Sequence, residues 1–118
     1  MREIEQPLRE DYQPHTLSDR LVDIANRLNW VSENARDMAV SAALPGAMRE
    51  CQFCIEWTAA ELEPENCAEL VDMQRYLGLW RKVWMESQLS PSLRTLLYLQ
   101  ARKWSERVRD FASLSQAA

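Results

Sequence analysis

Apolar residues recur every three or four positions over residues 21–42, and no other feature of the sequence constrains the fold as strongly. The residues of this stripe are Leu21, Ile24, Leu28, Val31, Ala35, Met38 and Ala42. Alternating steps of three and four place all of them along one side of an α-helix. The stripe therefore predicts a helix about 35–40 Å long, and its apolar side has to be covered by other helices of similar length.

The composition of the chain favours helices throughout. It contains 15 Leu and 13 Ala, against 12 β-branched residues, and only two glycines. Leu and Ala favour helix, whereas β-branched residues favour strand. No stretch alternates cleanly between apolar and polar residues, and the Asn-Gly and Asp-Gly pairs typical of hairpins are absent from the sequence. We predict an all-α protein.

Prolines and capping residues divide the sequence into an N-terminal arm and four helices. Pro7 and Pro14 indicate that residues 1–15 form an extended arm. The next helix is expected to begin after a cap at Thr16 or Ser18 and to end near Leu44, before Pro45-Gly46. Three further helices are expected at 47–62, 65–87 and 91–114. Short connections favour antiparallel neighbours, so residues 16–118 are predicted to be a single domain, an up-down-up-down four-helix bundle.

The middle of each apolar stripe should lie in the core of this bundle. The residues expected to be buried are Leu28, Val31, Leu77, Trp80, Leu97 and Trp104. In the third helix, Tyr76, Leu79 and Val83 extend the stripe to about half of the circumference. We therefore expect this helix to be among the most buried.

Charge is distributed unevenly along the chain. The net charge is −4, with −9 in residues 1–74 and +5 in residues 75–118. The overall acidity does not favour nucleic-acid binding. Acidic and basic helices can neutralise each other within a bundle, or the basic half can meet an acidic partner. For the second alternative the candidate is a basic stripe along the last helix, formed by Arg94, Arg102 and Arg109.

The three cysteines are interpreted as core thiols. Cys51 and Cys54 lie within a predicted helix rather than at its start, where a redox-active pair would lie. With Cys67 they supply only three thiols, and the single histidine, His15, lies in the arm. A structural zinc site needs four ligands, so we expect no metal and no cofactor. The sequence shows neither a signal peptide nor a stretch long enough to span a membrane, and reduced thiols suit a cytoplasmic protein.

Glu69-x-x-Asp72 is the one pattern with a catalytic counterpart. It resembles half of the metal-binding signature of the all-α nucleotide pyrophosphohydrolases, which pair a Glu-x-x-Glu with a later Glu-x-x-Asp to hold magnesium. The sequence has no Glu-x-x-Glu at suitable spacing upstream. The resemblance implies a magnesium-dependent enzyme, but two carboxylates on a helix are also typical of a solvated face.

Three aromatic residues, Trp30, Phe53 and Trp57, lie away from the main apolar stripes. Either wide apolar arcs cover them inside the bundle, or they form a protein interface, since Trp is frequent at binding hot spots. We expect a non-catalytic interaction module, regulatory or adaptor in character, that forms a homodimer through this surface. The alternatives are a bundle that binds a small apolar or aromatic ligand in a Trp- and Met-lined pocket and, third, the magnesium enzyme.

Overall fold

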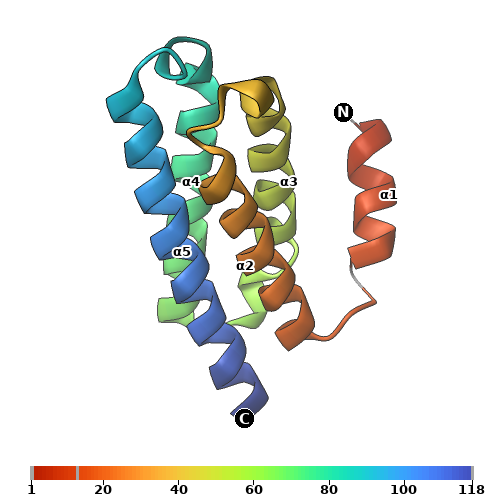
Figure 1. Ribbon diagram of the computed structural model, residues 1–118. Helices are drawn as coiled ribbons and strands as arrows, with labels where there is room; N and C mark the ends of the chain where they lie inside the picture. The colour runs from red at the N-terminus through yellow and green to blue at the C-terminus, as the bar shows by residue number, and fades with distance from the viewer. Residues whose placement is uncertain (1, 13, 118) are drawn as a thin grey trace.

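The computed structural model describes residues 2–12 and 14–117. Over these residues the chain is helical apart from short connections, with no strand, which confirms the predicted all-α class. The described part contains five α-helices and two short 3₁₀ helices (Figure 1): α1 Arg2–Tyr12, α2 Leu17–Asn34, η1 Met38–Ala43, α3 Leu44–Glu56, η2 Ala59–Glu61, α4 Pro64–Ser87 and α5 Pro91–Ala117.

The helices α2, α3, α4 and α5 lie together, and α1 stands outside them beside α3 (Figure 1). Helix α2 makes its most extensive contacts with α5 and also packs on α3, which in turn packs on α4. The contact between α4 and α5 is much smaller. The core therefore lies around α2, and the side of α4 that points towards α5 is only partly covered.

The N-terminal segment is not the extended arm that its prolines predict. Residues from Arg2 to Tyr12 form α1, with Pro7 inside the helix. A proline there removes one backbone hydrogen bond, but its fixed φ angle is compatible with a helix. Leu8 and Tyr12 lie one turn apart and both pack against the core. Their packing against the rest of the protein gives this short helix the tertiary support that local propensity alone does not provide.

Buried polar groups join α1 to the helices beside it. The Tyr12 hydroxyl donates to the carbonyl of Arg20 at 2.8 Å and shares a 3.2 Å hydrogen bond with Thr58 Oγ1. The buried Arg20 guanidinium donates to the carbonyls of His15 and Trp57, both at 3.1 Å, and pairs with Glu61 at 2.6 Å. Burying these groups is tolerated because each has a partner.

The first long helix is shorter than predicted. The Thr16 cap is confirmed, because its Oγ1 accepts a hydrogen bond from the Asp19 N–H at 3.1 Å. Helix α2 nevertheless ends at Asn34, about 27 Å from its start at 1.5 Å per residue. The Asp37 carboxylate then accepts a hydrogen bond from the Ala39 N–H at 2.9 Å and starts η1. The stripe is buried as far as residue 35, whereas its last two members, Met38 and Ala42, are exposed.

Prolines lie at the starts of the three remaining helices, α3, α4 and α5. Pro45 was expected to end the helix before it, but it lies in the first turn of α3, a position where its missing N–H costs little. Helix α3 ends at Glu56, and η2 occupies part of the range expected to continue it. Helices α4 and α5 start at Pro64 and Pro91, in agreement with the sequence signals.

The core contains five of the six residues expected there. Leu28, Val31, Leu77 and Leu97 are fully buried, and Trp80 is nearly so. Trp104 is only half-buried, because it lies on the side of α5 that faces the small contact with α4. None of the helices in the described ranges combines the length and the apolar character needed to cross a bilayer.

Candidate interaction surface

One side of α4 exposes large apolar residues. Tyr76 is 52% exposed, Leu79 58% and Val83 45%. They were expected to widen the buried stripe, and that expectation is wrong. The stripe of Leu70, Met73, Leu77, Trp80 and Trp84 already fills the core from α4. The next side chains around the helix point towards α5, which packs mainly on α2 and leaves them uncovered.

Helix α5 extends this apolar surface. Leu93 and Leu96 are exposed near its start, one turn apart. Leu93 and the three exposed α4 residues line a shallow hollow of about 350 Å³. We call Tyr76, Leu79, Val83, Leu93 and Leu96 the α4–α5 face. Monomeric proteins rarely expose large contiguous apolar patches, and such patches mark sites of interaction.

Polar groups support the floor of the hollow. The indole N–H of Trp80 donates to Gln100 Oε1 at 2.8 Å, and both residues line the hollow. The Trp80 and Trp84 rings pack edge to face with their centroids 6.4 Å apart. The second indole N–H, of Trp84, donates to the carbonyl of Ser41 at 2.9 Å. Large aromatic rings that are held in this way give the face a rigid base.

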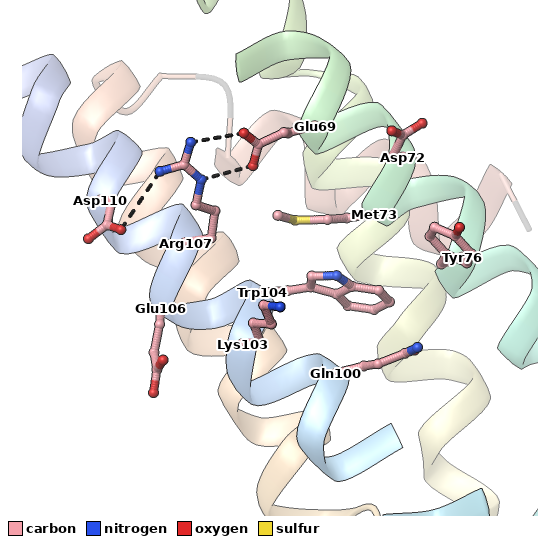
Figure 2. A pocket seen from close by; sticks show the side chains of 10 residues that line it. All are labelled: Glu69, Asp72, Met73, Tyr76, Gln100, Lys103, Trp104, Glu106, Arg107 and Asp110. Atoms are coloured by element: carbon pink, nitrogen blue, oxygen red, sulfur yellow. Dashed lines mark hydrogen bonds and ion pairs between the residues drawn. The ribbon is translucent and has the colours of Figure 1, made fainter. Parts of the chain in front are cut away.

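A second hollow, of about 650 Å³, continues along the same two helices (Figure 2). The half-buried Trp104 indole lies between the two helices and stacks on Tyr76, with ring centroids 6.2 Å apart. At the far end the Arg107 guanidinium donates two hydrogen bonds to the Glu69 carboxylate, both of 2.8 Å, and approaches Asp110 at 3.9 Å. Tyr76 and Gln100 line both hollows, so the two form one continuous groove.

The carboxylates of the Glu69-x-x-Asp72 pattern lie on this groove and are already engaged. The hydrogen bonds from Arg107 lower the pKa of Glu69, so its carboxylate is charged and bound to a cation of the protein itself. Asp72 lies 3.7 Å from Arg75. Among the described residues, no three His, Cys, Asp or Glu side chains gather closely enough to hold a metal ion. The arrangement is that of an inter-helix ion pair.

Phe53 and Trp57 are partly covered within the chain. Their rings stack at 5.7 Å with an angle of 8° between the planes, and both side chains are half-buried. From α1, Tyr12 packs on the Trp57 ring at 5.9 Å, and the Arg9 guanidinium lies 5.9 Å from the same ring. Helix α1, which lies beside α3 (Figure 1), thus covers part of its second apolar side. Most of the exposed large apolar residues lie on α4 and α5.

Trp30 lies apart from these two residues. It is 40% exposed and borders a separate hollow of about 500 Å³ between α2 and the start of α3. Ala43, Gly46 and Ala47 form the opposite wall. The structure therefore does not bring Trp30, Phe53 and Trp57 into one site.

The three arginines of the proposed basic stripe all have local partners. Arg94 contacts the sulfur of Met38. Arg102 donates to the Tyr98 hydroxyl at 3.2 Å and approaches Glu106 at 3.5 Å, as its i, i+4 spacing predicts. Arg109 donates to Asn26 at 2.9 Å. These contacts are made within α5 or with the segment of residues 26–38, so the stripe lies on the other side of α5 from the α4–α5 face.

The cysteines are free thiols. Cys51 and Cys54 are buried as expected, whereas Cys67, which was also expected in the core, is only half-buried. Burial raises the pKa of Cys51 and raises that of Cys54 to about 12. Thiols with pKa values this high are protonated at neutral pH and react slowly, because the thiolate is the nucleophile.

The α4–α5 face was missed by sequence reasoning, although the sequence held a signal for it. Residues 76, 79 and 83 make the apolar arc of α4 wider than one packed neighbour covers. From the sequence alone, the width of this apolar arc indicated that α4 would be more deeply buried. No protein-family model matches the chain, and comparison with curated proteins and with solved structures gives no significant match.

Proposed function

We propose that the protein is a non-catalytic interaction module and that the α4–α5 face is its binding surface. The observation that carries the proposal is the exposure of Tyr76, Leu79, Val83 and Leu93 around one hollow. Binding sites of proteins combine a central apolar area with a polar rim. Here the rim consists of charged residues at one end of the groove, among them Glu69, Arg107 and Asp110.

Site-specific photo-crosslinking tests this proposal. A photo-reactive phenylalanine analogue replaces Leu79 on the face, and in a matched control it replaces Glu33, an exposed residue of α2. Each protein is irradiated alone and in an extract of the cells that produce it. We expect a discrete adduct, with a second copy or with another protein, from position 79 only. Equal labelling from both positions, or no adduct from position 79 in either setting, contradicts the proposal.

We also infer that α2 to α5 form an up-down-up-down four-helix bundle and that the protein works in the cytoplasm. The short connections between these helices support the first inference. Three free thiols, two of them buried, support the second, because such thiols persist in a reducing compartment.

A second candidate function is the binding of a small aromatic ligand at Trp30. The observation that favours it is the hollow of about 500 Å³ beside a partly exposed indole, a volume within the usual range of small-molecule sites. A side chain added at Gly46 would meet nothing within 4 Å, so Gly46→Leu should fill the hollow without disturbing the fold.

The test is titration with indole, followed by NMR at the Trp30 side-chain N–H. Binding that is lost in Gly46→Leu and kept in Ala42→Leu would support this function. Ala42 is a suitable control because it is exposed and does not line the hollow. A Trp30 signal that does not respond to indole would exclude the site for this ligand class.

A further inference from the structure

Three cations gather where α3 meets α4, on the other side of α4 from the α4–α5 face. Arg49 belongs to α3, and Arg81 and Lys82 belong to α4; we call these three residues the basic cluster. Arg81 and Lys82 line a hollow of about 300 Å³ together with Pro45 and Gly78. We propose that the basic cluster binds a phosphate group in this hollow, either inorganic phosphate or the phosphate of a small molecule.

The basic cluster has no carboxylate to neutralise it. Among the described residues none of its members forms an ion pair, although five other arginines do: Arg20, Arg27, Arg75, Arg102 and Arg107. Glu86 follows Lys82 by one turn but does not pair with it, and Glu50, next to Arg49, pairs with Arg27 at 3.6 Å. In a chain with a net charge of −4, this local excess of positive charge favours an anion from outside the chain.

The Arg81 guanidinium is held in place and keeps an unused donor. Its Nη1 donates to Gln52 Oε1 at 2.6 Å, and the Gln52 amide in turn donates to the Gln74 carbonyl at 3.0 Å. The buried Nε of Arg81 has no acceptor in the part of the chain that the structure describes, and a buried N–H without a partner costs free energy. A phosphate bound through Nε and Nη2, in the two-bonded geometry typical of arginine and phosphate, would supply the missing acceptor.

Arg49 adds a second guanidinium beside the first. It lies 5.4 Å from the centroid of the Phe53 ring, a cation–π contact that holds the group and leaves its charge in place. Partial burial and the nearby Arg49 guanidinium lower the pKa of Arg81, but an arginine keeps its proton in proteins. The two like charges repel each other, and an anion bound beside both offsets that repulsion. A phosphate carries up to about two negative charges at neutral pH, so it offsets more of the repulsion than a carboxylate does.

An NMR titration tests the proposal, with the backbone amides of the two glycines as reporters. Gly78 lines the hollow, whereas Gly46 borders the separate hollow at Trp30. The protein is titrated near neutral pH with inorganic phosphate, glycerol phosphate or acetate, and chloride keeps the ionic strength constant. We expect a saturable shift of the Gly78 signal with a phosphate, a weaker response to acetate, and no shift at Gly46. Tighter binding of inorganic phosphate or of glycerol phosphate would show which source the site prefers.

Three variants connect the shift to the basic cluster. Arg81→Gln should weaken phosphate binding at least about tenfold, because hydrogen bonds to charged groups contribute that much. Lys82→Gln should also weaken it, and this variant is expected to fold because Lys82 is exposed. Arg102→Gln is the matched control on α5 and should bind phosphate as the wild type does. Circular dichroism establishes that each variant folds.

The proposal is overturned if neither phosphate shifts Gly78 saturably, or if acetate acts as strongly as phosphate. A folded Arg81→Gln or Lys82→Gln protein that binds phosphate as tightly as the wild type overturns it too. An equal loss in Arg102→Gln would mean that phosphate responds only to net charge, and would also exclude the site. The interaction role of the α4–α5 face is independent of these outcomes, because crosslinking from position 79 tests it separately.

Discussion

Gln52 and Gln74 join α3 to α4 by exchanging hydrogen bonds. The side-chain amide of Gln52 donates to the Gln74 carbonyl at 3.0 Å, and the amide of Gln74 donates to the Gln52 carbonyl at 2.9 Å. The Arg81 guanidinium donates to the side-chain oxygen of Gln52, Oε1, at 2.6 Å. The amide lies where Gly78 has no side chain, since a Cβ there would be 2.9 Å from Gln52 Nε2. The missing side chain of Gly78 thus leaves room for this amide.

Gly78→Ala should therefore have opposite effects in two backgrounds. In the wild type the new methyl group displaces Gln52, and the lost hydrogen bonds, about 0.5–1.5 kcal/mol each, outweigh the gain in helix propensity of about 1 kcal/mol. In Gln52→Ala only the gain remains, so stability should rise by about 1 kcal/mol. Urea unfolding of the four proteins measures this cycle. Stabilisation of the same size in both backgrounds would show that the two residues are not coupled.

Tyr12→Phe should separate the role of the hydroxyl from that of the ring. The hydroxyl bonds the Arg20 carbonyl and Thr58 Oγ1, both buried. Removing it leaves these groups without a partner and should cost about 1–3 kcal/mol of unfolding free energy. Tyr76→Phe is the matched control, because that side chain is 52% exposed, and it should change stability by less than about 0.5 kcal/mol. Equal losses in the two variants would contradict the assigned role of Tyr12.

The buried thiols should make the protein less stable in alkaline solution. Burial raises the pKa of Cys51 and Cys54 in the folded state, for Cys54 to about 12. Above about pH 9 the thiols ionise in the unfolded chain but stay protonated in the folded one, because an unperturbed thiol has a pKa of about 8.5. The unfolded state then binds fewer protons, so stability falls as pH rises, by up to about 1.4 kcal/mol per thiol and pH unit.

Urea unfolding at about pH 8 and about pH 10.5 measures this slope. Cys51→Ala/Cys54→Ala is the comparison, because it lacks both thiols and keeps the tyrosines and lysines, which also titrate in this range. Its stability should fall less steeply with pH than that of the wild type. Parallel slopes would mean that the two thiols are not buried as described.

The sequence predicted those elements whose start and packing are decided locally. Ser90-Pro91 and Pro64 mark the starts of α5 and α4, and Thr16 caps α2, because each acts through backbone groups of its own turn. The N-terminal helix could not be predicted in this way. Its formation depends on Tyr12 reaching Arg20 across the turn that follows and Thr58, which lies 46 residues further along the chain.

The candidate site was harder to predict than the fold. An apolar arc on a helix indicates burial whether the cover is another helix of the same chain or another molecule. The sequence assigned the uncovered apolar surface to Phe53 and Trp57 because α3 has two apolar sides. It could not show that α1 would fold and pack on Trp57, or that α5 would pack on α2 and leave Leu79 exposed.

Leu77 and Leu79 offer a direct comparison between the core and the proposed binding surface. They are two residues apart on α4, yet Leu77 is fully buried and Leu79 is 58% exposed. Leu77→Ala leaves a cavity and should cost about 2–5 kcal/mol of stability. Leu79→Ala should cost less than about 1 kcal/mol, because its side chain lies on the surface. Urea unfolding of both variants checks the two expectations. A large loss of stability in Leu79→Ala would place that residue in the core and remove the basis for the α4–α5 face.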